Sequence, residues 1–266
     1  MKTQSSISSV PEKQNTLFVS SLAKGLKILR AFDESAVELS LADLVAKTGL
    51  EKSAVQRLAN TLHLEGMLDK DPTTRRYRPS HAWLEMAYAY FWSNPLVRLA
   101  MPTLIELSHQ LDATVNLAEL SGDHVLYVSR VPGRSGQFAS TLVGRRLPAL
   151  SSAAGRVMLS TIPESRRKNM IKTWTLQPMT QHTEMDRSRI AKHIVDAGNR
   201  GFSMTQDQSI LNQTGIAAPI RAPDGEALAA IQCSVSTRLW TSERIEKEIL
   251  PYIIEAADSI SPNTRG

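Results

Sequence analysis

Residues 40–80 read SLADLVAKTGLEKSAVQRLANTLHLEGMLDKDPTTRRYRPS, and this stretch decides the fold of the first part of the chain. Ser40 precedes an apolar-periodic run and has Asp43 three residues later, an acidic form of the capping box that opens helices. Gly49 ends that helix, because glycine readily adopts the left-handed conformation of a tight turn between helices. A second helix opens at Lys52, so the stretch begins as a helix-turn-helix.

The predicted second helix has two different faces. Val55, Leu58 and Leu62 recur at the spacing of a buried stripe. The opposite face carries polar, amide and basic side chains of the kinds that reach base edges and phosphates in a major groove. These candidate DNA-binding residues are Lys52, Ser53, Gln56, Arg57 and Asn60.

A short basic β-hairpin is predicted after Gly66. One strand begins at Met67, residues 71–74 form the turn, and the returning strand carries the basic residues Arg75, Arg76 and Arg78. Beside a recognition helix, such a hairpin is a wing that contacts the phosphate backbone or the minor groove. The alternative is an interior helical hairpin with a solvated run of charges, which the order and spacing of helix, turn and wing disfavour.

At this point the chain resembles the IclR family of bacterial transcription regulators. The likeness in the first part rests on SLAKGLKIL (residues 21–29), LADLVAKTGLEKSAVQRLANTLHLEGML and RRYRPS. In the second part it rests on GRRLPALSSAAGRVMLS (residues 144–160), RGFSMTQDQ and GIAAPIRAPDGEALAAIQCSVS. The resemblance covers roughly residues 20–260, in two domains that match in the right order.

The fold class that follows has two domains. The first is a mainly α winged helix-turn-helix, and the second is an α+β, GAF-like effector-binding domain with an antiparallel sheet. We expect a flexible tail over residues 1–19, the DNA-binding domain over 20–80, a linker helix over 81–94, and an effector-binding and oligomerisation domain over 95–262.

Hydrophobic periodicity places the remaining elements. Leu22, Leu26, Leu29 and Phe32 form the stripe of a first helix, and another helix runs from Pro95. Helices are predicted over residues 152–161, 163–173 and 184–200, the last capped by Thr183, followed by a single final helix through Ile245 and Ile253. Strands are predicted over residues 114–120, 124–131, 202–205, 216–221 and 227–235.

Composition agrees with a protein that meets a polyanion. The chain has 266 residues and a net charge of +5, and 42% of its residues are hydrophobic. Residues 52–81 hold six Lys or Arg against three Asp or Glu, so the positive charge concentrates on the presumed DNA face. The lone Cys233 excludes an intrachain disulfide, and no apolar run is long enough for a membrane span. We therefore expect a cytoplasmic protein that does not enter the membrane.

The segment before residue 94 is rich in aromatic side chains. A lone helix cannot bury all of them on one face, and a partner surface would resolve this; in the resembled family this helix helps to pair two subunits. The alternative is that the aromatics pack on the two domains of their own chain. The candidate oligomerisation residues are Trp83, Tyr88, Tyr90, Phe91 and Trp92.

No enzyme motif is present. Six histidines are scattered without metal-ligand spacing, and we expect neither a metal site nor a cofactor. Ser151 or Ser152 could be imagined as a nucleophile, but nothing in the sequence marks a base beside them.

A ligand pocket is better supported by the run Ser151-Ser152-Ala153-Ala154-Gly155. Small side chains at the start of a helix leave backbone N–H groups accessible to a carboxylate, although simple close packing explains the run equally well. The family resemblance favours the pocket, because the matching segment contacts the effector. Carried over by position, it implies these effector-binding residues: Leu147, Ala153, Ala154, Thr205, Gln213, Gly215, Gln232 and Ser234.

Three of these positions depart from the family's usual pattern. An acidic residue is common where Thr205 stands, cysteine where Gly215 stands, and often serine where Gln232 stands. These departures argue against a metal and against a small keto acid. Gly215 removes volume, which favours an aromatic or longer aliphatic acid.

Three hypotheses for the function follow. The first is a transcription regulator that binds a roughly palindromic DNA operator as a homodimer or dimer of dimers, under the control of a small organic acid. The second is a hydrolase or transferase with an appended DNA-binding domain. The third is a constitutive architectural DNA binder whose second domain only oligomerises.

Overall fold

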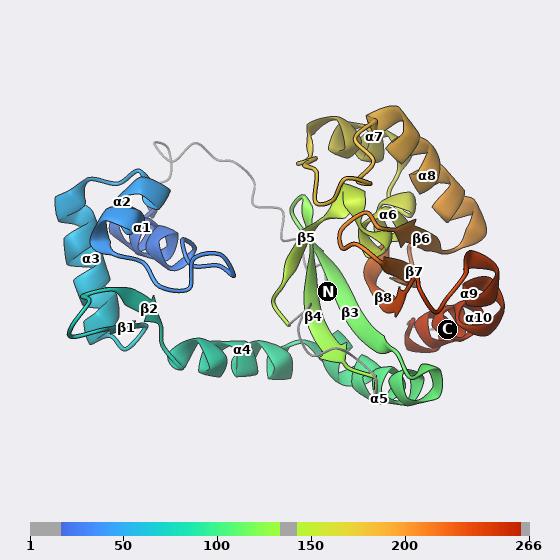
Figure 1. Cartoon of the computed structure of the whole chain (residues 1–266), viewed down its shortest axis with the longest axis horizontal. Coiled ribbons are helices and arrows are strands. Elements are labelled where there is room, and N and C mark those ends of the chain that lie inside the picture. The colour runs from blue at the N-terminus through green and yellow to red at the C-terminus, as the bar shows by residue number, and fades with distance from the viewer. Residues whose placement is uncertain (1–16, 134–142, 262–266) are drawn as a thin grey trace. The chain divides into compact units, whose positions relative to one another are not determined.

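The computed structural model describes residues 17–133 and 143–261, and the chain divides into two compact units (Figure 1). The first unit extends to Ser93, and the second begins at Asn94. We call them the DNA unit and the effector unit. Most of the predicted tail, residues 1–16, and the last residue of the predicted second domain lie outside the described residues.

The DNA unit contains four helices and a two-stranded hairpin among its described residues. A buried apolar cluster that includes Ile28, Leu44, Val55 and Leu68 holds them together. Its elements are α1 (Ser20–Leu29), α2 (Leu41–Thr48), α3 (Lys52–Leu64), β1 (Leu68–Lys70), β2 (Tyr77–Pro79) and α4 (Ala82–Ser93).

The predicted helix-turn-helix signals are present. The Ser40 hydroxyl accepts a hydrogen bond from the amide of Asp43 at 3.2 Å, and the Ser40 amide donates to the Asp43 carboxylate at 2.9 Å. Gly49 has a φ of 63°, a left-handed conformation that side chains other than glycine's adopt at a cost. This reciprocal cap and this glycine fix where α2 begins and ends, and thereby the angle at which α3 leaves it.

The predicted first helix is present, and the predicted stripe is buried only at its end. Phe32 belongs to the buried cluster and Leu29 packs against it, whereas Leu22 and Leu26 are exposed. Within the helix, the buried residues are Gly25 and Ile28.

The effector unit is built on one antiparallel sheet of six strands in the order β5-β4-β3-β8-β7-β6. Its strands are β3 (Thr114–Ser121), β4 (His124–Val131), β5 (Arg146–Pro148), β6 (Ser203–Gln206), β7 (Gln213–Arg221) and β8 (Ala227–Ser236). Its helices are α5 (Pro95–Leu111), the 3₁₀ turn η2 (Ala149–Ser151), α6 (Ala153–Ser160), α7 (Glu164–Thr173), α8 (Arg187–Arg200), α9 (Ser242–Glu248) and α10 (Leu250–Ile260).

Helix α6 packs on one face of this sheet. A buried cluster joins Ala153, Ala154 and Val157 of α6 to Ala217 on β7 and Ala230 on β8. Helices α5 and α10 contact the sheet and each other, and α8 packs on α6 from outside (Figure 1). Only small side chains separate α6 from β7 and β8, so the helix lies close to the strands.

The start of α6 is fixed by its cap and by one close backbone contact. The Ser152 hydroxyl accepts from the Gly155 amide at 3.0 Å. A Cβ on Gly155 would lie 2.1 Å from the carbonyl oxygen of Ala149 in η2, so no other residue fits without moving backbone. The small residues of this run are therefore required for packing.

Three predictions for the effector unit are corrected. Strand β5 was not predicted, because Arg146–Pro148 has only three residues and becomes a strand by pairing with β4. Asp186, not Thr183, caps α8, while the Thr183 hydroxyl donates to the Gln208 carbonyl at 2.7 Å. The single final helix is two helices, since Pro251 at the start of α10 lacks the N–H that would continue α9.

The predicted fold class is confirmed: a helix-turn-helix unit with a wing is followed by an α+β unit with an antiparallel sheet. Among residues 17–133 and 143–261, no helix combines the length and apolar character of a membrane span.

Gly155→Ala tests the close contact at the start of α6. We expect the effector unit to lose about 2 kcal/mol or more of unfolding free energy, because the added methyl forces backbone apart. Urea denaturation of the full chain measures this loss. The matched control is Gly198→Ala in α8, whose new Cβ would meet its nearest neighbour, Ser160 Cβ, at an ordinary 3.4 Å. Equal stability losses in the two variants would contradict the account.

Candidate functional site

The outer face of α3 is free for recognition. All five predicted residues, Lys52, Ser53, Gln56, Arg57 and Asn60, are exposed, while Val55 and Ala59 on the opposite side are buried. Within the described residues, the Arg57 guanidinium has no hydrogen-bond or ion-pair partner. The structure thus brings two cations, two amides and a hydroxyl together on one face of a helix, and an α-helix fits into a major groove.

The wing arginines are exposed but differ in their contacts. Arg76 Nη1 lies 3.3 Å from the Asp43 carboxylate and donates to the Glu38 carbonyl, and Arg78 Nε lies 3.4 Å from Asp69. Arg75 stands in the turn with a φ of 59°. Exposed ion pairs are weak in water, so a phosphate can replace the carboxylate partner of either arginine.

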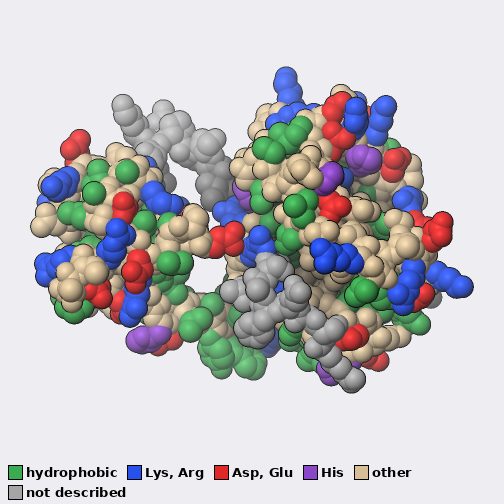
Figure 2. All heavy atoms as spheres, viewed as in Figure 1, with side chains coloured by type: hydrophobic (Ala, Val, Ile, Leu, Met, Phe, Trp, Pro, Cys, Tyr) green, Lys and Arg blue, Asp and Glu red, His purple; other side chains and the backbone are tan. Residues whose placement is uncertain are grey.

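The aromatic residues near α4 fall into two groups. Trp83 belongs to the DNA unit, because its Nε1 donates to the Met67 carbonyl at 2.9 Å and its ring meets Phe32 edge-on. Tyr88 and Trp92 are 64% and 59% exposed, and no residue of α4 is buried. Hydrophobic side chains therefore gather on the surface over α4 (Figure 2). Of the five candidate oligomerisation residues, Trp83 is therefore engaged within the DNA unit, and the other four lie further along α4.

A pocket in the effector unit brings seven of the eight predicted effector residues together. It is a small cavity, with a volume of about 30 Å³, that is partly open to solvent. The predicted residues that line it are Leu147, Ala153, Thr205, Gln213, Gly215, Gln232 and Ser234. Ala154 does not line it and is fully buried in the apolar cluster between α6 and the sheet.

Five further residues of the pocket were missed by sequence reasoning: Tyr127, Ser152, Gln208, Ser209 and Ile210. Ser152 stood in the quoted run, and Tyr127 stood at an inward position of a predicted strand. The other three lie in the loop between β6 and β7. This loop approaches α6 through tertiary contacts, which a local sequence pattern cannot predict.

The pocket is polar but carries no ionised side chain among its described lining residues. Its positive end is the start of α6, where the amide of Ala153 has no acceptor among the described residues. A helix amino terminus with a free N–H group stabilises a carboxylate. The space beside Gly215 is small: a Cβ there would lie 3.3 Å from Gln232 Nε2, 3.4 Å from Thr205 Oγ1 and 3.7 Å from Ala153 Cβ.

The nucleophile candidates serve structural roles or lack activation. The Ser152 hydroxyl caps α6, and the buried Ser151 hydroxyl has no hydrogen-bond partner in the described part of the chain. Burial raises the pKa of Cys233 to about 12, so this thiol stays protonated. Within the two described ranges, no group of three or more His, Cys, Asp or Glu is placed to hold a metal ion.

A buried arginine forms a hydrogen bond with a residue of the pocket wall. Arg156 of α6 is 4% exposed; its Nε donates to the Leu150 carbonyl at 2.8 Å, and Nη2 donates to Gln208 Oε1 at 3.3 Å. Burial lowers the pKa of Arg156 to about 10, and the charge of Glu184 opposes that shift, so the guanidinium remains protonated at neutral pH.

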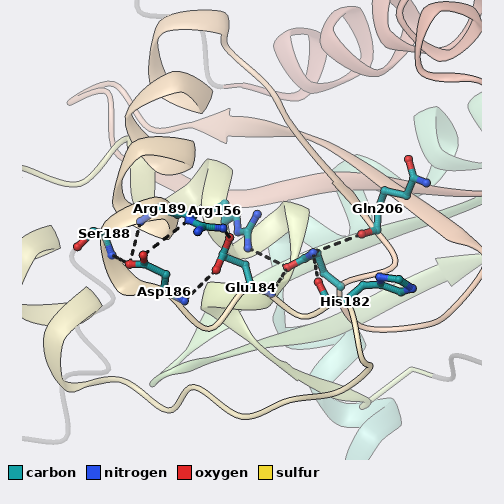
Figure 3. Close-up of polar contacts among 8 residues, drawn as sticks. Arg156, His182, Glu184, Asp186, Ser188, Arg189 and Gln206 are labelled. Carbon is teal, nitrogen blue, oxygen red and sulfur yellow. Dashed lines mark hydrogen bonds and ion pairs between the residues drawn. The ribbon is translucent and has the colours of Figure 1, made fainter.

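The Arg156 cluster ties the pocket loop to the start of α8 (Figure 3). Gln208 Oε1 also accepts from the Glu184 amide, and Gln208 Nε2 donates to the His182 carbonyl at 2.7 Å. The Glu184 carboxylate in turn meets Arg189 on α8. Because the Gln208 amide is occupied on both atoms, it holds the wall of the pocket in place rather than offering a free group to a ligand.

Comparison with known proteins covers both units. Residues 88–262 match the family described as bacterial transcriptional regulator IclR C-terminal, and residues 21–72 match the IclR helix-turn-helix domain. The Pca regulon regulatory protein of Pseudomonas putida is 30% identical over 241 residues, which are 90% of this chain and 82% of that protein.

Solved structures agree with the fold. An IclR family transcriptional regulator from Brucella abortus has a TM-score of 0.78 at 24% identity, covering 96% of each chain. An IclR homolog from Microbacterium hydrocarbonoxydans, complexed with 4-hydroxybenzoate, has a TM-score of 0.74 at 21% identity, covering 92% of this chain and 99% of that one. At these identities the likeness shows the fold alone.

Arg57→Ala tests the α3 face. We expect operator affinity to fall about tenfold or more, and discrimination among single base changes to relax, because a good base contact is worth about 1–3 kcal/mol. Fluorescence anisotropy with a set of operator variants measures both effects. Lys24→Ala removes one exposed charge from α1 of the same unit and serves as the control. An operator preference unchanged from wild type would remove Arg57 from base recognition.

Arg76→Ala tests the wing. We expect affinity to fall for all DNA sequences alike, and the slope of log affinity against log salt to decrease by about 0.9, the value for one phosphate contact. Arg166→Ala is the matched control, because Arg166 is an exposed, carboxylate-paired arginine of the effector unit. A slope equal to that of the control would show that Arg76 contacts no phosphate.

Proposed function

This chain belongs to the IclR family of bacterial transcriptional regulators, and we propose that it binds a palindromic operator as a homo-oligomer whose DNA affinity is set by a small organic acid. The observation that carries the ligand part is the pocket at the start of α6, which is lined by Ala153, whose amide has no acceptor among the described residues, and by neutral polar side chains. The recognition part is supported by the exposed polar face of α3 and the basic wing.

Pairing of two chains through α4 is supported by its exposed apolar side chains. Leu84, Met86, Tyr88 and Trp92 are all more than half exposed, and aromatic side chains are enriched in the cores of protein interfaces. Two copies related by a two-fold axis would present two α3 helices to two half-sites, so the operator would have matching symmetry. We place the protein in the cytoplasm, where bacterial operators are.

Binding rather than catalysis is the role that the pocket supports. The lining residues include no acid, histidine or cysteine within the described part of the chain, and Ser152 is engaged as a helix cap. Catalysis of acyl transfer would require a base beside a nucleophile, whereas recognition of an acid requires only oriented donors.

The ligand class is an organic acid larger than a two- or three-carbon acid. Glycine at position 215 leaves unfilled the volume that a larger residue would occupy, and the start of α6 receives the carboxylate. The 4-hydroxybenzoate complex of the Microbacterium hydrocarbonoxydans homolog supports an aromatic acid as the first probe.

The test is operator binding with and without acids. The purified protein is titrated onto the DNA upstream of its own gene at fixed salt, with benzoates and straight-chain acids added in turn. A several-fold shift of the dissociation constant by one acid is the expected result. Sequence-specific binding that no acid shifts would contradict control by an acid. Binding without sequence preference that no acid shifts would favour a constitutive architectural binder, and turnover of an acid or ester that Ser152→Ala abolishes would establish the enzyme hypothesis.

Gly215→Ala tests where the acid binds. The new methyl fits without backbone movement but occupies the space between Gln232 and Thr205, so we expect the active acid to be needed at about tenfold higher concentration. Operator anisotropy at increasing acid measures the midpoint. Gly198→Ala adds the same methyl outside the pocket and should leave the midpoint unchanged. Equal midpoints for both variants would place the acid elsewhere.

A further inference from the structure

Arg156 is a buried cation that makes no ion pair with a carboxylate in the described part of the chain. It is 4% exposed, and the two acceptors of its guanidinium are neutral oxygens, the Leu150 carbonyl at 2.8 Å and Gln208 Oε1 at 3.3 Å. A buried charge is unfavourable unless an opposite charge compensates it. Arg156 therefore lacks a counter-charge within pairing distance.

The acid that influences Arg156 is Glu184, and its charge is shared. Its carboxylate lies 3.5 Å from Arg189 Nη1 on α8, and the three side chains lie together in Figure 3. Burial lowers the pKa of Arg156 to about 10, while the charge of Glu184 opposes that shift. The guanidinium thus carries a full positive charge at neutral pH, and Glu184 compensates it only in part.

The pocket has the opposite deficiency. No Asp, Glu, Lys, Arg or His is found among its described lining residues. The amide of Ala153 stands at the start of α6, and a helix amino terminus acts as roughly half a positive charge. A carboxylate that leaves water for neutral surroundings is unfavourable without further positive charge. An ionised acid in this pocket therefore requires more positive charge than the lining residues supply.

The guanidinium lies one residue away from the pocket. Gln208 lines the pocket and accepts the hydrogen bond from Arg156 Nη2. On its other side Arg156 is held to Leu150 in η2, the turn that leads directly into α6. The cation is thus fixed between the pocket wall and the segment before the helix start, where a carboxylate is expected.

We propose that Arg156 is the counter-charge of the effector, a residue that makes the pocket select an anion without touching it. Charges attract one another over longer distances in a protein interior than in water, so direct contact is not required. The bound acid in turn compensates the buried guanidinium. The rival is a purely structural role, in which Arg156 only holds Gln208 in place. This proposal rests on the proposed function, because it assigns the charge that the same pocket needs.

The test compares each acid with its neutral amide on the full-length protein. Benzoate and benzamide share one shape, as do hexanoate and hexanamide, and calorimetric titration gives the ratio of acid to amide affinity. Arg156→Gln removes the charge and keeps an amide donor. We expect this ratio to fall about tenfold, the effect of one unit charge across about 10 Å at an effective dielectric constant of about 20. Loss of wall support alone would weaken acid and amide equally.

Three further variants give different expected directions. Arg156→Lys keeps the charge and should keep the ratio. Glu184→Gln removes the negative charge that partly compensates Arg156, so the ratio should rise about two- to threefold. Arg167→Gln is the matched control: Arg167 Nη1 also donates to carbonyls, those of Ser160 and Ile162 at the other end of α6, and its loss should leave the ratio unchanged.

The outcomes separate the two proposals. A ratio unchanged in Arg156→Gln would overturn the counter-charge while leaving an acid effector in place, and so would equal losses of acid affinity in Arg156→Gln and Arg156→Lys. Binding of neither acid would contradict the proposed effector class, and with it this assignment. If neither amide binds measurably, the acid affinities of Arg156→Gln and Arg156→Lys decide. Should Arg156→Gln fail to fold, Glu184→Gln decides, since an acid affinity that stays constant or falls would overturn the assignment.

Discussion

The effector unit depends on the contact between Gly155 and the backbone of Ala149. Because no side chain fits there, η2 and α6 meet at a fixed angle, and the start of α6 lies beside Gly215 on β7. Close packing and ligand binding were alternative explanations of the run of small residues 151–155. The structure shows close packing at Gly155, and the same packing leaves Ala153, whose amide has no acceptor among the described residues, at the wall of the pocket. The close packing at Gly155 therefore also positions the start of α6, to which we assign the binding of the carboxylate.

The two units use different electrostatic interactions. In the DNA unit, full charges on exposed side chains act at the surface, where salt screens them and weak pairs such as Arg76–Asp43 exchange partners easily. In the effector unit, the pocket is lined by neutral polar groups, and Arg156, the one cation buried among the described residues, holds Gln208 rather than lining the cavity. DNA affinity should consequently respond to ionic strength far more than acid affinity does.

The sequence predicted the parts that local patterns govern and missed those that tertiary contacts create. The cap at Ser40, the turn at Gly49 and the polar face of α3 follow from spacing, and all are present. Strand β5 forms by pairing with β4, and Gln208 is held at the pocket by its hydrogen bond with Arg156. Both depend on tertiary contacts, so no local sequence pattern predicts them. Tyr127 lies on a predicted strand, but a buried tyrosine on a strand usually belongs to the core, so the sequence did not identify it as a pocket residue.

The most direct test of the account is a crystal structure of the full-length protein with the active acid bound. The account predicts that the carboxylate accepts a hydrogen bond from the amide of Ala153, with the rest of the ligand extending past Gly215 into the pocket. A carboxylate bound at another place in the pocket, with the start of α6 facing water, would contradict it.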